Sequence, residues 1–310
     1  MRLGVFLPQM GPVAGPEAIS RVARWAEEAG LDGIWVTERT LVPLEPQTPY
    51  PAGELPDIYR RSLDPIETLA FVAPQTSRIR LGTSILNLNW YRPVLLARRL
   101  ATLDLLSNGR LTVGLGQGWS KDEYDVAGTP WTDRGRRFEE ALEALKTIWA
   151  TNPVEFAGDF YEIPASYVEL EPVQKPHPPI YMAAYTPAAL ERTGRLADAW
   201  HPVGVPIANV PEMFEVVKAA AERAGRDPAS LSLSVRANPS VTEAPLGDDR
   251  WDFTGSPDQL ASDFARTREA GADELVIDPS ADPGVRTADD FLERLELFAR
   301  LAREAAGAPA

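Results

Sequence analysis

Three glycines at alternate positions follow a run of β-forming residues in the segment RLTVGLGQGW, residues 110–119. Gly114, Gly116 and Gly118 have the spacing G-x-G-x-G, whereas the dinucleotide-binding fingerprint requires G-x-G-x-x-G leading directly into a helix. Trp119 occupies the last fingerprint position, and the next helical pattern begins only near Arg134. The glycines therefore do not indicate a dinucleotide-binding turn, and they must serve another purpose.

The residues that follow the predicted strands are mostly amides, hydroxyls and aromatics. They are Pro8, Gln9, Thr37, Glu38, Arg39, Ser84 to Asn89, Gln117 to Ser120, Tyr185, Thr186, His201, Arg236, Asn238 and Asp278. A barrel glycosidase needs two opposed carboxylates, and a metal-dependent barrel needs a cluster of His, Asp and Glu. Neither pattern is present. The residues suit a planar organic cofactor that brings its own reactivity.

Eight apolar or β-branched runs bounded by turn residues predict the strands that carry these residues. They cover residues 3–7, 31–36, 79–86, 110–116, 179–184, 197–203, 231–237 and 273–278. Amphipathic segments with helical spacing alternate with these runs, and several end at a glycine. Strict strand–helix alternation favours a parallel sheet and, at this length, a closed (β/α)8 TIM barrel. A doubly wound open sheet is the structural alternative.

Three connections are too long to be plain turns, at about residues 38–61, 151–178 and 238–255. The first is rich in proline and aromatic residues, and the second contains VEFAGDFYEIP, which predicts a hairpin. We expect a single domain over residues 1–310 in which these segments are insertions. The first two are candidate lids or binding loops, because long ordered loops in compact domains usually have such roles.

The composition restricts the possible partners and locations. The 310 residues carry a formal net charge of -14, which repels phosphate backbones and anionic membranes, so we expect neither nucleic acid nor membrane as a partner. There is no cysteine and only two histidines, so disulfides and thiolate nucleophiles are excluded and no metal site is expected. The N-terminus lacks the apolar region of a signal peptide and no stretch is long and apolar enough to span a bilayer, which predicts a cytoplasmic protein.

Five segments together resemble the luciferase-like monooxygenase superfamily and, within it, the oxidoreductases that use the deazaflavin coenzyme F420. The segments are LGVFLPQ, LDGIWVTER, the block from Ile79 to Tyr124, DRGRRFEEALEALKTIW and PVQKPHPPIYMAAYTPAALERTGRLADAWHP. The similarity runs from residue 1 to about residue 240, and the block from Ile79 to Tyr124 is its most specific part. The resemblance implies a TIM barrel of the bacterial-luciferase-like type.

The resemblance also implies where the cofactor binds. In relatives the turn after the fourth strand lies against the cofactor and its glycines let backbone amides approach the phosphate, while the turn after the fifth strand supplies amides at a helix N-terminus. Ser84 and Ile85 are expected to be joined by a cis peptide bond. The implied cofactor-binding residues are Ser84, Ile85, Asn87, Gln117, Gly118, Trp119, Ala184, Tyr185 and Thr186.

One departure from the family pattern affects the expected proton chemistry. Many relatives carry an acidic residue followed by histidine at the end of the second strand, whereas this chain has Glu38 followed by Arg39. Arg39 cannot exchange a proton near neutral pH, but it could stabilise an anionic ring or enolate, or anchor the first insertion by pairing with Glu45 or Glu54. Proton delivery then falls to Glu38, His201, a tyrosine such as Tyr185, or water. The expected catalytic residues are Glu38, Arg39 and His201.

Several of these residues also have ordinary structural interpretations. His201 could cap a turn before Pro202, and Trp119 could be a core aromatic, although its place after three glycines favours the wall of a substrate pocket. Glu123, in the stretch KDEY, is interpreted as a capping or structural carboxylate, and His177, which lies between prolines, as structural.

The expected function is that of an F420-dependent oxidoreductase that transfers a hydride between the deazaflavin C5 and a small organic substrate. The alternatives are an FMN-dependent monooxygenase that takes reduced flavin from a partner reductase, a non-catalytic flavin-binding barrel and, more remotely, a hydrolytic barrel. Relatives are commonly dimers, so a homodimer is expected. The polyglutamate tail of F420 is expected to need basic groups at the rim, such as Lys175 or Arg195.

Overall fold

The computed structural model describes residues 1–305, so the last five residues of the expected domain lie outside it. Parallel strands form a closed barrel in the order β3-β2-β1-β13-β10-β9-β8-β5-β4, and the pairing of β3 with β5 closes it. The strands are β1 (Arg2–Phe6), β2 (Gly33–Val36), β3 (Arg80–Thr83), β4 (Leu86–Asn87), β5 (Leu111–Gly116), β8 (Ile180–Met182), β9 (Ala199–Trp200), β10 (Ser232–Ala237) and β13 (Glu274–Ile277). Since β3 and β4 are two pieces of one strand position, the barrel has eight positions, and the predicted (β/α)8 barrel is confirmed.

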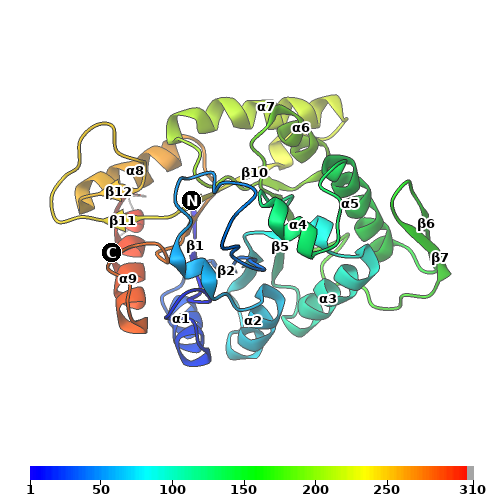
Figure 1. Ribbon diagram of the computed structural model, residues 1–310, viewed down its shortest axis with the longest axis horizontal. Coiled ribbons are helices and arrows are strands. Elements are labelled where there is room, and N and C mark those ends of the chain that lie inside the picture. Colours follow the sequence, from blue (N-terminus) through cyan, green and yellow to red (C-terminus); the bar gives the residue numbers. More distant parts are fainter. Residues whose placement is uncertain (306–310) are drawn as a thin grey trace.

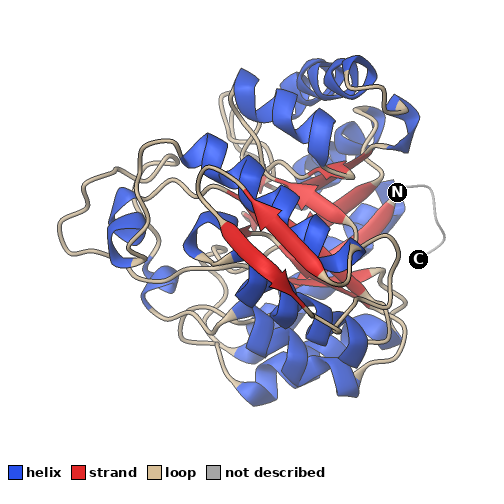
Figure 2. Ribbon diagram, turned by 90° about the vertical axis from the view of Figure 1, so that its right-hand side faces the viewer, coloured by secondary structure: helices blue, strands red, loops and turns tan. Residues whose placement is uncertain are grey.

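Helices surround the barrel (Figures 1 and 2). They are α1 (Pro16–Glu28), α2 (Pro65–Val72), α3 (Pro93–Leu106), α4 (Lys121–Val126), α5 (Arg134–Ala150), α6 (Pro187–Leu196), α7 (Val210–Arg223), α8 (Pro257–Glu269) and α9 (Ala288–Ala305). Proline at the first helical position starts five of them, where its missing N–H costs nothing. The short helix α4 was not predicted, and Ser120 caps it by accepting from the Glu123 amide. Short 3-10 turns cover Asp57–Arg60, Ala73–Gln75, Leu88–Trp90, Ile207–Asn209 and Pro228–Ser230.

The core has two layers because successive strand residues point to opposite faces. The larger layer lies between the strands and the helices, and a separate buried cluster consists of Phe6, Trp35, Tyr181, Ala199 and Val276. This cluster fills the barrel interior, as expected for a packed barrel rather than a pore.

The three insertions differ in structure. Residues 38–61 are mostly irregular. The second insertion carries the predicted hairpin, formed by β6 (Val154–Ala157) and β7 (Glu162–Ser166), which projects from the body of the molecule (Figure 1). In the third, β11 (Ser240–Val241) pairs with β12 (Thr254–Gly255). Among residues 1–305, no helix has the length and apolar character needed to cross a bilayer.

Candidate active site

The third barrel strand is interrupted at Ser84 and Ile85, between β3 and β4. The peptide bond joining them is cis, which confirms the expectation for this position. Thr83 fixes the strand just upstream, because its hydroxyl donates to the Gly114 carbonyl at 2.9 Å and accepts from the Gly114 amide at 2.8 Å. Ser84 is buried, whereas Ile85 is half-buried among buried strand residues. The interruption therefore places the Ile85 side chain at the carboxyl end of the barrel.

The glycines of β5 make room for this interruption. A Cβ at Gly114 would overlap the Thr83 carbonyl, and one at Gly116 would lie 2.7 Å from Cδ1 of Ile85. Gly118 has a φ of +68°, and a Cβ there would overlap the Asn87 side-chain amide. The space beside all three glycines is thus filled by the protein itself. Close packing alone therefore requires glycine at these positions, and the approach of their backbone amides to a phosphate stays a prediction.

A buried hydrogen-bond network fixes the side chain of Ser84. The Ser84 hydroxyl lies 2.8 Å from Nε2 of His201, and Nδ1 of His201 lies 2.9 Å from the Ser234 carbonyl. Because a carbonyl can only accept, Nδ1 carries the hydrogen and Nε2 accepts from Ser84. Burial, assisted by the charge of Arg236, lowers the pKa of His201 to about 3. His201 is therefore neutral with both nitrogens occupied, which favours a role in positioning Ser84 over direct proton delivery.

Arg236, on β10, holds the other polar group of Ser84. Its Nη1 donates to the Ser84 carbonyl at 2.9 Å, and its Nη2 donates to Asp278 at 2.5 Å. The guanidinium lies over the Phe6 ring, 4.1 Å from the centroid. Sequence reasoning placed Arg236 at a strand end but gave it no role. The signal that could have identified it is a charged residue inside a predicted buried strand.

Glu38, at the end of β2, is joined to the third strand. Its Oε2 accepts from the Asn87 amide at 2.7 Å, and its Oε1 accepts from the Tyr91 hydroxyl. Burial raises the pKa of Glu38 to about 7, against the opposing effect of these two hydrogen bonds. A carboxyl group with this pKa can gain or lose a proton near neutral pH. The structure thus brings together Glu38 and Asn87, and adds Tyr91, which sequence reasoning did not single out.

Arg39 forms a buried ion pair with Glu123 of α4. Its Nη1 lies 2.6 Å from Oε2 of Glu123, and the two side chains are 6% and 3% exposed. Glu123 also accepts from the Thr40 amide at 2.8 Å. The expected anchoring partners Glu45 and Glu54 are therefore wrong, because Glu123 fills that role.

Aromatic rings of the first insertion and of the turn after β5 enclose the Arg39 guanidinium. It lies 5.0 Å from the centroid of the Tyr59 ring and 4.7 Å from that of Trp119. The Tyr50 ring meets Trp119 edge-on at 5.2 Å. The first insertion therefore packs against the turn after β5, as expected of a lid, with Trp119 at the contact.

The turns after β5 and β8 carry the remaining residues implied for the cofactor. The Gln117 carbonyl accepts from the Asn87 side-chain amide at 2.8 Å. Ala184 is buried and its carbonyl accepts from the Trp200 indole at 2.9 Å, while Thr186 caps α6. Tyr185 is 49% exposed. Since β4, β5 and β8 are neighbours in the sheet, all nine implied residues lie along one arc of the barrel's carboxyl end.

Comparison with known proteins identifies the family. A family model described as luciferase-like monooxygenase matches residues 1–246. The chain belongs to the luciferase-like monooxygenase family.

Relatives and solved structures agree with this assignment. An uncharacterized protein of Mycobacterium tuberculosis is 36% identical over 263 residues, which cover 82% of this chain and 92% of the relative. The F420-dependent glucose-6-phosphate dehydrogenase of Amycolatopsis mediterranei is 32% identical over 190 residues, covering 60% of this chain and about half of that enzyme, 53%. A monooxygenase from Streptomyces bottropensis has the same fold, with a TM-score of 0.79 at 23% identity and coverage of 99% and 100%.

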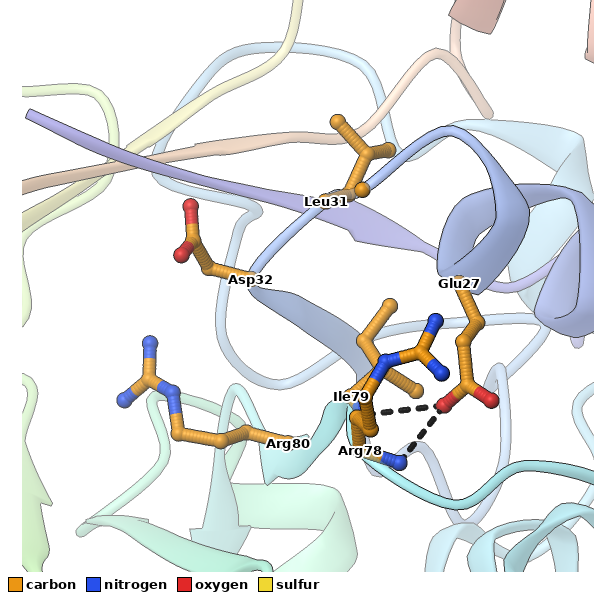
Figure 3. Close-up of a pocket in the computed structure, with 7 residues that line it drawn as sticks. Glu27, Leu31, Asp32, Arg78, Ile79 and Arg80 are labelled. Carbon is orange, nitrogen blue, oxygen red and sulfur yellow. Dashed lines mark hydrogen bonds between the residues drawn. The ribbon is translucent and has the colours of Figure 1, made fainter.

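A cavity of about 370 Å³ opens at the other end of this luciferase-like monooxygenase barrel, near the amino ends of β2 and β3 (Figure 3). Its carboxylates are already engaged. Glu27 accepts from the amides of Arg78 and Ile79 at 2.7 and 3.0 Å, and Asp32 accepts from the Leu3 amide at 2.7 Å. This end of a TIM barrel normally serves stability, so the candidate active site is the carboxyl end.

The basic residues expected at the rim are also at the amino end. Lys175 follows Gln174, whose side chain donates to the Leu111 carbonyl at the start of β5. Arg195 lies in the last turn of α6 and pairs with Glu139 at 2.9 Å. The expectation that Lys175 and Arg195 meet a cofactor tail is therefore wrong, because both residues lie where the strands begin.

Proposed function

We propose that this protein is an F420-dependent oxidoreductase that transfers a hydride between the deazaflavin C5 and a small organic substrate. The sequence relationship to an F420-dependent dehydrogenase supports the cofactor. Because that match covers only about half of the relative, its substrate is not carried over. The observation that carries the proposal is the half-buried Ile85, held at the carboxyl end of the barrel by the Ser84 network.

The residues around Ile85 fit the face of a planar ring. A Cβ at Gly116 would touch both Ile85 and, at 3.7 Å, the Cβ of Ala183, so these three residues form a continuous surface without bulky side chains. Exposed residues border it, namely Gly118 after β5 and Tyr185 and Thr186 after β8. Their backbone amides, at a turn and at the start of α6, suit the phosphate of a cofactor side chain.

When bound, the deazaflavin supplies the carbon that accepts or gives the hydride. The chain's own residues orient the ring and manage charge and protons. Ser84 is fixed by His201 and Arg236, which keeps Ile85 in place without any need for the histidine to change its protonation state. Glu38 holds a proton at its carboxyl group near neutral pH, beside the Tyr91 hydroxyl. We therefore propose Glu38 as the proton-transfer residue.

Arg39 would contribute fixed positive charge near the ring or substrate. Its pairing with Glu123 compensates much of that charge, so we propose that Arg39 acts mainly by holding the first insertion over the site. Under this proposal Arg39→Ala raises KM more than it lowers kcat. A larger effect on kcat would instead support direct stabilisation of an anion.

Titration of the protein with F420 and with FMN, each in both redox states, tests the proposed cofactor. We expect F420 to bind at least about tenfold more tightly, which corresponds to about 1.4 kcal/mol. Ile85→Ala should weaken F420 binding about tenfold through lost apolar contact, whereas Val216→Ala, at an exposed position on α7, should leave it unchanged. Equal or tighter binding of FMN would refute the proposal in favour of a reduced-flavin monooxygenase. Binding without turnover of any alcohol, aldehyde or ketone in a substrate panel would favour a non-catalytic barrel.

We also propose that the protein is a homodimer. Four large apolar side chains are exposed on α2 and α3, namely Phe71, Leu95, Leu105 and Leu106, at 45% to 62%. Neighbouring exposed apolar side chains are typical of association surfaces. Sedimentation should give the dimer mass for the wild type and the monomer mass for Leu95→Glu/Leu106→Glu. The control Val216→Glu, on α7, should remain dimeric.

A further inference from the structure

Three arginines near the candidate site have no acidic partner within residues 1–305. Arg134 and Arg137 lie on the first turn of α5, and Arg92 precedes the first turn of α3. Acidic residues outnumber basic ones by 45 to 31 in this chain, yet no carboxylate of the described residues pairs with these three. A fourth arginine of this turn, Arg136, pairs with Asp159 at 2.5 Å on the surface.

Aromatic rings hold two of these guanidinium groups in place. Arg134 lies over the Trp131 ring at 4.0 Å, and Arg137 lies over the Phe160 ring at 4.2 Å. A guanidinium stacked by its face keeps its N–H edges available and loses less conformational freedom when it binds an anion. Nε of Arg137 is buried and has no hydrogen-bond partner. Nη1 of Arg134 donates to the Trp131 carbonyl at 3.3 Å. The stacking therefore orients both guanidinium groups, and their remaining N–H groups are available to a ligand that the protein itself does not supply.

The third arginine faces the same region. Burial raises the pKa of Tyr161, and the charges of Arg137 and Arg92 both oppose this effect. Both guanidinium groups thus lie within electrostatic range of one phenol. Helix α5 contacts both helix α3 and strand β6 of the hairpin and lies beside them (Figure 1). The arginines therefore belong to one surface, to which two helices and the second insertion contribute.

This surface begins at the proposed cofactor site. The Arg134 carbonyl accepts from the Asn89 side-chain amide at 3.0 Å and from the Gln117 side-chain amide at 3.3 Å. Gln117 belongs to the turn after β5, and Asn89 follows β4. The first turn of α5, which carries Arg134 and Arg137, therefore borders the proposed cofactor site.

We infer that Arg92, Arg134 and Arg137 bind the carboxylates of an extended anionic cofactor tail, of the kind that the polyglutamate tail of F420 provides. The inference rests on the proposed function and deepens it. FMN ends at a single phosphate, for which the backbone amides of the two turns already suffice. Three unpaired guanidinium groups leading outward from the turn instead match a chain that carries several negative charges.

The test compares F420 with its tail-free core, which keeps the same ring, sugar-alcohol chain and phosphate but carries no glutamates. At low ionic strength we expect the wild type to bind F420 at least about thirtyfold more tightly than the core. Arg134→Ala/Arg137→Ala should lose about tenfold in affinity for F420 and nothing for the core. The loss should shrink as salt increases, because exposed charges are screened.

Arg24→Ala/Arg268→Ala is the matched control, since it removes the same charge from exposed positions on α1 and α8, away from α5 (Figure 1). It should leave both affinities unchanged. Unchanged affinity for the core also verifies that the arginine variant is folded. If wild type binds core and F420 equally, or if the variant weakens both ligands equally, the inference is wrong while the proposed function stands. If wild type binds neither, the proposed function fails and the inference with it.

Discussion

Replacing His201 with glutamine should reduce the amount by which the free energy of unfolding falls at acid pH. Burial lowers the pKa of His201 to about 3 from its ordinary value of 6.5. Between these values the unfolded chain binds a proton at the imidazole and the folded chain does not. The stabilising effect of the neutral ring is therefore fully present above pH 6.5 and is lost as the pH falls toward 3.

The magnitude follows from this difference. From pH 7 to pH 5, protonation of the unfolded chain at His201 lowers the free energy of unfolding by about 2 kcal/mol, at about 1.4 kcal/mol for each pH unit below 6.5. Glutamine can still accept from the Ser84 hydroxyl but leaves the Ser234 carbonyl without its donor. The variant should thus be less stable at pH 7 by about 1 to 3 kcal/mol. That deficit should narrow by about 2 kcal/mol at pH 5, because only the wild type carries the titrating ring.

Urea unfolding of both proteins at pH 7 and pH 5 measures this change. Every other titrating group is common to the two chains and cancels in the comparison. His177→Gln changes the other histidine and keeps His201. It should show the same His201-dependent decrease in the free energy of unfolding between pH 7 and pH 5 as the wild type. A deficit for His201→Gln that is the same at both pH values, within about 0.5 kcal/mol, would refute the assignment of His201 as a permanently neutral donor and acceptor.

Three further outcomes are expected in urea unfolding. Arg39→Met should lower the free energy of unfolding by about 3 to 5 kcal/mol, because it leaves Glu123 buried without its partner. Arg39→Met/Glu123→Leu should recover most of that stability. A loss below about 1 kcal/mol for Arg39→Met would contradict a buried ion pair. Gly204→Ala should lower the free energy of unfolding by about 1 to 2 kcal/mol, and Gly118→Ala should lower it by more. Both glycines have a φ of +68°, but only Gly118 has a neighbour where the Cβ would lie. Equal losses of stability would argue against that overlap. Since the pKa of Glu38 is raised from 4.5 to about 7, the stability contributed by its protonated form is fully present below pH 4.5 and is lost as the pH rises through 7. Glu38→Gln should remove about 2.5 kcal/mol of the decrease in the free energy of unfolding between pH 5 and pH 8, and an unchanged pH dependence would exclude the raised pKa.

The strands and helices of the barrel were predictable because each type of element has its own spacing of apolar residues along the sequence. Every predicted strand run overlaps a barrel strand, although the run at 197–203 shortens to Ala199–Trp200. The run at 79–86 is split at Ser84 and Ile85. Only the family resemblance predicted an irregular backbone at these two residues. The hairpin at VEFAGDFYEIP was visible because two short β-forming stretches flank a turn.

The contacts between distant segments were not predictable from local patterns. Arg39 is separated from Glu123 by 84 positions, and nearer carboxylates such as Glu45 and Glu54 were equally plausible partners. Lys175 was wrongly expected at the carboxyl end of the barrel because the expectation used only its charge. Its position before β8 places it at the amino end. The polar groups around His201 come from separate strands, and alternation along one strand does not reveal what it faces across the barrel.

The charges at the carboxyl end of the barrel restrict how protons can move there. Arg39 pairs with Glu123 and Arg236 pairs with Asp278, so neither of these arginines offers an uncompensated charge. His201 stays neutral, and the resemblance implies a histidine where Arg39 stands. A proton that moves near neutral pH must therefore use a group whose pKa lies there, and Glu38, with a pKa of about 7, meets that condition. If the proposed oxidoreductase chemistry is correct, the pH dependence of its turnover reports Glu38.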